Sequence, residues 1–172
     1  LAHTLSGNLI EAKNDYLAGL EIAEQKFGSD SGPKAIADVL LSEVYYQQNE
    51  LERASMCLQN SFRHVVEYDG WADIYITGYQ MDIALSCAWG EYQTALNIVH
   101  EGEETAKIRG LKRLFGLLQA ARYWIYVISG NLREAEQLRD KEFSFQYDLW
   151  KRHPENWRQF CAWGIAVAEH DI

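Results

Sequence analysis

The sequence has few of the residues that break or cross-link a polypeptide. Its 172 residues include two prolines and three cysteines, and the 12 glycines stand singly. A disordered linker rich in proline and glycine is therefore excluded. The cysteines, Cys57, Cys87 and Cys161, form neither a CxxC nor a Cys/His metal-binding pattern. We expect them to be small buried side chains of a protein in a reducing cytoplasm rather than metal ligands.

Long apolar runs, a signal peptide and basic clusters are missing as well. No apolar run approaches the ~18 residues that a membrane-spanning helix needs. The formal net charge of -9 has the wrong sign for gripping phosphates. We therefore expect a cytoplasmic domain that contacts neither membrane nor nucleic acid directly. The chain begins at Leu1, not Met, and its first residues already have helical character, so we expect a piece of a longer protein.

Sequence patterns typical of enzymes are also lacking. No GxSxG, GxxxxGK[ST] or CxxC motif occurs, and the five histidines lie far apart. His100 and Glu101 begin as an HExxH zinc motif would, but Glu104 occupies the place of the second histidine. Glu101, Glu103 and Glu104 are expected to form a solvated helix face. We predict no enzymatic activity, no bound metal and no cofactor.

What the sequence does contain is an internal repeat. SGNLIEA at 6–12 is almost the same as SGNLREA at 129–135, and between them stand NELERA at 49–54 and GEYQTA at 90–95. Aligned on Ala12, Ala54, Ala95 and Ala135, which we call the repeat alanines, the copies are 42, 41 and 40 residues apart. Five residues before each repeat alanine stands Gly7, Asn49, Gly90 or Gly130.

Each position of this motif suits a turn between two helices. Glycine or asparagine can end a helix because it adopts the left-handed backbone conformation at low cost. The short polar residue after it can cap or favourably charge the next helix. A second glycine, Gly28, Gly70 or Gly110, follows 15 or 16 residues after a repeat alanine, which is one helix length. Each copy is therefore predicted to be a helical hairpin followed by a longer turn.

No segment alternates with the period of a β-strand over a useful length, so helices are expected throughout. The predicted helices are 8–27, 34–48, 50–68, 72–88, 91–109, 112–129, 131–143 and 155–170. We predict an all-α fold, an α-α superhelix (solenoid) of helical hairpins with a period of about 41 residues. It forms one domain, 1–172, with units at about 1–28, 34–70, 72–110 and 112–150, and a further unit beginning at 155–172. After Phe143 the segment SFQYDLWKRHP has no terminating glycine and is expected to be bent or irregular.

The stretch SEVYYQQNELERA at 42–54 resembles the tetratricopeptide repeat, with its small residue, tyrosine pair, turn and alanine. That repeat has a period of about 34 residues, so these tetratricopeptide-like hairpins have longer helices or turns. The longer period is similar to that of the helical repeat region of MalT-like, ATP-dependent LuxR-type transcriptional regulators. The segments that carry this resemblance are VYYQQNELERA at 44–54, AKIRGLKRLF at 106–115 and RYWIYVISGNLREA at 122–135. The resemblance itself extends over nearly the whole chain.

The resemblance implies a non-catalytic sensor or protein-interaction domain. Members of the family join a nucleotide-binding switch module, a helical repeat sensor and a DNA-binding helix-turn-helix. The partners implied are an inducer of unknown identity or a regulatory protein, and the other domains of the same chain. A generic tetratricopeptide peptide-binding scaffold unrelated to transcription is the alternative, and stacking of exposed repeat ends leaves a homo-oligomer open.

The tetratricopeptide register suggests where a ligand would bind. First helices of such hairpins line a concave groove, and the candidates for ligand or partner contact there are Glu43, Tyr46, Gln47, Gln80 and Trp124. Aromatic rings at such positions either contact a ligand or fill gaps between helices, and the sequence leaves both open.

Two charged residues occupy matching positions on neighbouring first helices. Asp82 and Arg122 each lie 13 residues before a repeat alanine, where Leu41 is apolar. Opposite charges at matching half-buried positions predict an ion pair between repeats. The alternative is that both side chains contact a polar inducer.

Overall fold

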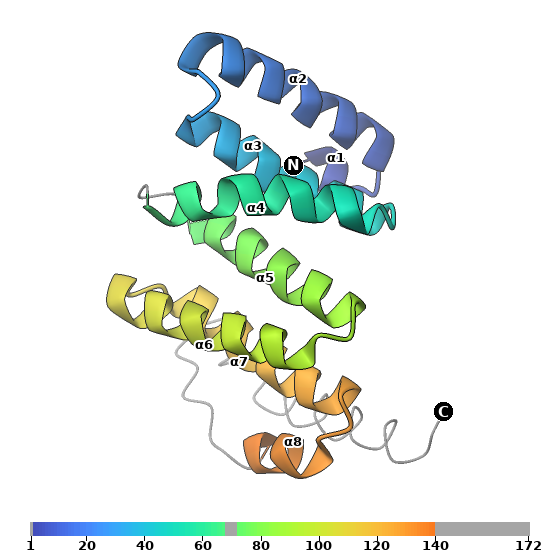
Figure 1. Cartoon of the computed structure of the whole chain (residues 1–172), viewed down its shortest axis with the longest axis vertical. Helices are drawn as coiled ribbons and strands as arrows, with labels where there is room; N and C mark the ends of the chain where they lie inside the picture. The colour runs from blue at the N-terminus through green and yellow to red at the C-terminus, as the bar shows by residue number, and fades with distance from the viewer. Residues whose placement is uncertain (1, 68–71, 140–172) are drawn as a thin grey trace. The chain divides into compact units, whose positions relative to one another are not determined.

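The computed structural model describes residues 2–67 and 72–139, and all regular secondary structure within them is helical. The elements are α1 (Ala2–Leu5), α2 (Leu9–Phe27), α3 (Gly32–Gln47), α4 (Leu51–Glu67), α5 (Ala72–Ala88), α6 (Tyr92–Arg109), α7 (Lys112–Ile128) and α8 (Leu132–Arg139) (Figure 1). The predicted all-α fold is confirmed for this part of the chain, and the predicted bounds of α2 to α7 are each within two residues of those observed. The irregular segment predicted after Phe143 and the helix predicted at 155–170 lie outside the described residues. None of the helices described is both long and apolar enough to cross a bilayer.

The chain divides into two compact units, Leu1–Ala88 and Trp89–Ile172. In the first unit α2 packs on α3, and α3, α4 and α5 pack on one another. In the second unit α7 packs on both α6 and α8. Each unit has its own apolar core. The fully buried large side chains are Val39, Leu41, Val44, Val65, Tyr75, Tyr79 and Leu85 in the first unit and Val99, Leu114, Leu118, Tyr123 and Ile125 in the second.

Helix ends occur at the glycine and asparagine that precede the repeat alanines. Gly7, Gly90 and Gly130 have φ of 78°, 74° and 76°, and Asn49 has φ of 60°. At Gly7, Asn49 and Gly130 the backbone N–H donates to the carbonyl three residues earlier at 2.9–3.1 Å, and the next N–H donates to the carbonyl five residues before it at 2.8–2.9 Å. These two bonds satisfy carbonyls at the end of the helix. They form because the glycine or asparagine at this point has the left-handed backbone conformation. The predicted helix ends are confirmed.

The repeat alanines are fully buried. Ala12, Ala54, Ala95 and Ala135 are at most 1% exposed. Each donates its backbone N–H to the carbonyl four residues earlier, which begins the next helix. The side chains of Asn8 and Glu91, which stand just before α2 and α6, make no capping hydrogen bond. Of the two roles predicted for this position, capping is not observed at Asn8 or Glu91, whereas the carboxylate of Glu91 is consistent with the other role, a favourable charge at the start of α6.

Replacing Asn49 tests the left-handed turn between α3 and α4. Asn49→Ala is expected to lower the free energy of unfolding by about 1 kcal/mol, because a β-carbon is strained at positive φ. Asn49→Gly should match or exceed the wild type, since glycine accepts this conformation without strain. Urea unfolding followed by circular dichroism measures both. Gln59→Ala, at an exposed position within α4, is the control and should leave the midpoint nearly unchanged; equal effects of Ala and Gly at position 49 would contradict the interpretation.

Candidate functional site

Four of the five groove candidates lie in the first unit. Glu43, Tyr46 and Gln47 occupy one face at the end of α3, because residues three and four apart lie above one another on a helix. Glu43 and Tyr46 are half-buried, whereas Gln47 is exposed. Gln80, which lies on α5 (Ala72–Ala88), is also exposed. α3 packs on α5, so these side chains come from neighbouring helices. Trp124 of α7 belongs to the second unit and is 43% exposed. All five are accessible, and their joining into one groove stays a prediction.

Glu43 is a half-buried carboxylate that no lysine or arginine pairs with among the described residues. Its hydrogen-bond partner within residues 2–67 and 72–139 is the Gln47 amide, whose Nε2 donates to Oε1 at 3.4 Å. Burial raises the pKa of the Glu43 carboxyl above its ordinary value. The surrounding structure therefore disfavours the charged form of this side chain.

Two other carboxylates of the first unit, those of Asp38 and Glu50, pair with basic side chains. The Oδ2 atom of buried Asp38 accepts hydrogen bonds from Lys34 Nζ at 2.8 Å and from Ser61 Oγ at 2.6 Å. Because Ser61 lies on α4, this carboxylate ties α3 to α4. Glu50 accepts from Lys13 of α2 at 3.1 Å and from Arg53, and these partners, Lys13 first, lower the pKa of its carboxyl. A lysine or arginine pairs with each of these two carboxylates, whereas within residues 2–67 and 72–139 none pairs with Glu43.

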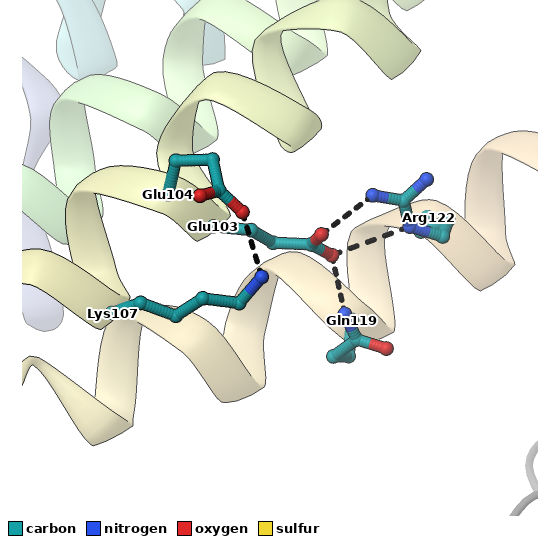
Figure 2. Close-up of polar contacts among 5 residues, drawn as sticks. All are labelled: Glu103, Glu104, Lys107, Gln119 and Arg122. Carbon is teal, nitrogen blue, oxygen red and sulfur yellow. Dashed lines mark hydrogen bonds and ion pairs between the residues drawn. The ribbon is translucent and has the colours of Figure 1, made fainter.

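The second unit contains a buried carboxylate at the contact of α6 and α7. Glu103 Oε2 accepts from Arg122 Nη2 at 2.8 Å and Oε1 accepts from Arg122 Nε at 3.3 Å, so the pair is bidentate. The Gln119 amide also donates to Oε1 (Figure 2). Glu103 is 6% exposed, whereas Glu101 and Glu104 are exposed. The expected solvated face is therefore wrong for Glu103, because its side chain points to α7 instead of water.

Glu103 is not among the site residues predicted from the sequence, but the repeat alignment contains a signal for it. Leu20, Phe62 and Glu103 each lie eight residues after a repeat alanine, and Phe62 is buried. A charged residue at a position that is apolar in the other copies indicates a buried partner. Arg122 was selected from its position, and it pairs with Glu103 in the structure. The pairing of Arg122 with Asp82 stays a prediction, because Asp82 belongs to the other compact unit.

Aromatic side chains divide into core and surface groups. Tyr75, Tyr79 and Tyr123 are fully buried and fill gaps between helices, as the packing alternative proposes. Trp89 and Trp124 are 45% and 43% exposed. For Trp124 this exposure keeps ligand contact open, because an indole needs accessible area to stack on a ligand.

The described cysteines are poorly suited to chemistry. Burial raises the pKa of the Cys57 thiol to about 11, and burial also raises the pKa of the Cys87 thiol. A thiol with a raised pKa is a poor nucleophile at neutral pH. Residues 2–67 and 72–139 contain no group of three or more His, Cys, Asp and Glu side chains that could hold a metal ion. Cys161 lies outside the described residues.

Replacing Glu43 tests whether its charge is unfavourable for folding. A raised pKa in the folded state means that the stability contribution of Glu43 is full below its unfolded pKa of about 4 and is lost as the pH rises through the folded value. Glu43→Gln should therefore raise the free energy of unfolding by roughly 0.5 kcal/mol at pH 7, because solvent screens a half-exposed carboxylate. The difference from the wild type should vanish near pH 4. Thermal unfolding across this pH range measures it, with exposed Glu101→Gln as the control; a loss of stability at pH 7 would contradict it.

Comparisons with known proteins assign no family to this chain. A functional proposal for this chain therefore depends on its residues and their geometry, for the following reason. No family model, curated protein or solved structure matches the sequence or its fold.

Proposed function

We propose that the chain is a non-catalytic sensor and protein-interaction domain of a LuxR-family, MalT-like bacterial transcriptional regulator. In this proposal its hairpins form a tetratricopeptide-like solenoid with a period of about 41 residues. The observation that carries the proposal is a residue with positive φ that recurs at Gly7, Asn49, Gly90 and Gly130, at a spacing similar to that of this family's repeats.

Contacts between successive helices also recur at the same offsets. Phe62 lies eight residues after a repeat alanine and packs on Tyr79, which lies 16 residues before the next one. Glu103 and Gln119 have the same two offsets and also touch. One of these contacts belongs to each compact unit. Recurrence of a contact together with a turn is what stacking of one repeated hairpin predicts, and it supports the solenoid.

In this proposal each compact unit offers its own accessible side chains to a ligand or partner, those of α3 and α5 in the first unit and those of α7 in the second. Glu43, Tyr46, Gln47 and Gln80 offer polar groups, and Trp124 offers a flat apolar ring. Side chains of this kind suit a small polar inducer or a segment of a regulatory protein. Binding shifts the population toward one curvature of the solenoid, and that curvature couples to a nucleotide-binding switch and a DNA-binding domain.

A thermal-shift screen of sugars and small metabolites tests both sets of side chains. An inducer present at a hundred times its Kd should stabilise the protein by about 2.7 kcal/mol, which raises the unfolding midpoint by roughly 5–10 °C for a chain of this size. Tyr46→Ala should remove most of the shift for an inducer that binds the first unit, and Trp124→Ala should do so for one that binds the second, because each deletes an accessible ring of its own unit.

The control for this screen is Trp89→Ala, since Trp89 is as exposed as Trp124 but lies in the turn between α5 and α6. It should keep the full shift. A shift that survives Trp124→Ala and Tyr46→Ala but disappears in Trp89→Ala would contradict this assignment. If no compound shifts the midpoint, sensing of a small molecule is contradicted, and a protein partner or a plain peptide-binding scaffold takes its place.

A further inference from the structure

The two helix contacts that recur in the repeat have opposite chemistry. On α4 and α5, the edge of one ring of the pair Phe62 and Tyr79 meets the face of the other, with centroids 4.9 Å apart and planes at 90°. On α6 and α7, the Glu103 carboxylate is held by Gln119 and Arg122 (Figure 2). The same place in successive hairpins is thus an aromatic contact once and an ionic contact once.

A glycine makes the aromatic contact possible. Gly78 of α5 lies directly under the Phe62 ring, and a β-carbon added there would be 2.1 Å from Phe62 Cε2. The equivalent position on α7 is Leu118, because Gly78 and Leu118 each lie 17 residues before a repeat alanine. Leu118 is fully buried. By this equivalence we expect a ring at position 103 to collide with Leu118, and a glutamate side chain, which has no ring, to avoid that collision.

Each contact would fail if the partners were exchanged. Were α7 to pack on α4, Arg122 would lose its carboxylate and Leu118 would collide with the Phe62 ring. Were the face of α5 that carries Tyr79 to replace α7 against Glu103, that carboxylate would face the Tyr79 ring with no donor from Gln119 or Arg122. A buried charge that loses its partner is strongly destabilising, and a core with extra volume is strained.

We propose that these two contacts form a pairing code that decides which second helix packs on which first helix. In one half of the code the Phe62 ring packs edge-to-face on Tyr79 and occupies the space left by the missing side chain of Gly78, which we call the notch. The other half is a carboxylate clamp, Glu103 held by Gln119 and Arg122 beside Leu118. Hairpins built from one repeat have similar faces, and the code prevents them from exchanging partners within a chain or between copies. It does not depend on the regulatory role proposed above.

Transferring the aromatic half to α6 and α7 tests the code in the full chain. The triple variant is Glu103→Phe, Gln119→Tyr and Arg122→Leu, and it carries the ring pair without the glycine that makes room for it. Leucine is chosen at position 122 because Leu41 occupies the equivalent position of another copy. Adding Leu118→Gly to this variant should raise the ratio of folded to unfolded protein at least about tenfold, because the notch admits the new ring. In the wild type, Leu118→Gly should lower that ratio by about 100-fold or more, because it empties a buried site and places glycine in a helix.

The sign reversal at Leu118 is the decisive result, measured by urea unfolding. Leu114→Gly is the matched control, because Leu114 is also fully buried on α7; it should destabilise both backgrounds alike. If Leu118→Gly lowers stability in both backgrounds, the code is overturned. Should the triple variant fail to fold, recovery of helical circular dichroism on adding Leu118→Gly supports the code, and failure of the quadruple variant to fold overturns it.

Discussion

Glu103→Ala is expected to lower the free energy of unfolding by about 3 kcal/mol, the largest loss that we predict for a charged residue. The substitution removes a bidentate partner from Arg122, whose side chain is 20% exposed, and an acceptor from Gln119. The guanidinium then remains partly desolvated without the carboxylate that holds it in the wild type. Because single domains are stable by about 5–15 kcal/mol, a loss of this size moves the urea midpoint clearly.

Two further variants separate the charge from the volume of Glu103. Glu103→Gln retains an oxygen that can accept from Gln119 or Arg122 but removes the charge, so its stability should fall between those of the wild type and Glu103→Ala. The double variant Glu103→Leu with Arg122→Leu should recover most of the loss, since an apolar pair at a buried ion-pair site is often neutral or stabilising.

The neighbouring acid provides the control for position 103. Glu104 pairs with Lys107 at 2.7 Å on the surface of α6, and both side chains are about half exposed (Figure 2). Glu104→Ala should leave the unfolding midpoint unchanged, because water replaces an exposed partner readily. Equal effects at positions 103 and 104 would show that the buried ion pair has no special weight in the fold.

Helix bounds were predictable from this sequence because the signals for them are local. A left-handed residue such as Gly130 or Asn49 ends a helix through its own backbone conformation, whatever packs around it. The spacing of the repeat then places the remaining turns. Agreement for α2 to α7 follows from this local control.

Side-chain environments were harder to predict, because they depend on residues of other helices. Glu103 and Glu104 are adjacent in the sequence, yet one is held by α7 and the other by its own helix. Only the repeat alignment distinguishes them. Glu103 lies eight residues after its repeat alanine, and the residue at the equivalent position of the preceding copy is the apolar Phe62. Asp38 was missed for the same reason, since its partner Ser61 comes from α4.

Gly78→Ala should destabilise the protein by about 1–3 kcal/mol, although alanine is the better helix former. The new β-carbon would lie 2.1 Å from the Phe62 ring. That ring cannot move aside freely, because it is buried and packs edge-to-face with Tyr79. The collision therefore outweighs the gain of about 1 kcal/mol that alanine brings within a helix.

Gly19 of α2 is the matched control, since a β-carbon there would meet no atom within 4 Å. Gly19→Ala should raise the free energy of unfolding by up to about 1 kcal/mol, so the same substitution has opposite signs in two helices. Combining Gly78→Ala with Phe62→Leu should restore part of the lost stability, because leucine vacates the space that the ring fills. A stabilising Gly78→Ala, or no coupling between positions 62 and 78 in this cycle, would mean that the Phe62 ring does not occupy the notch, and the aromatic half of the pairing code would fall with it.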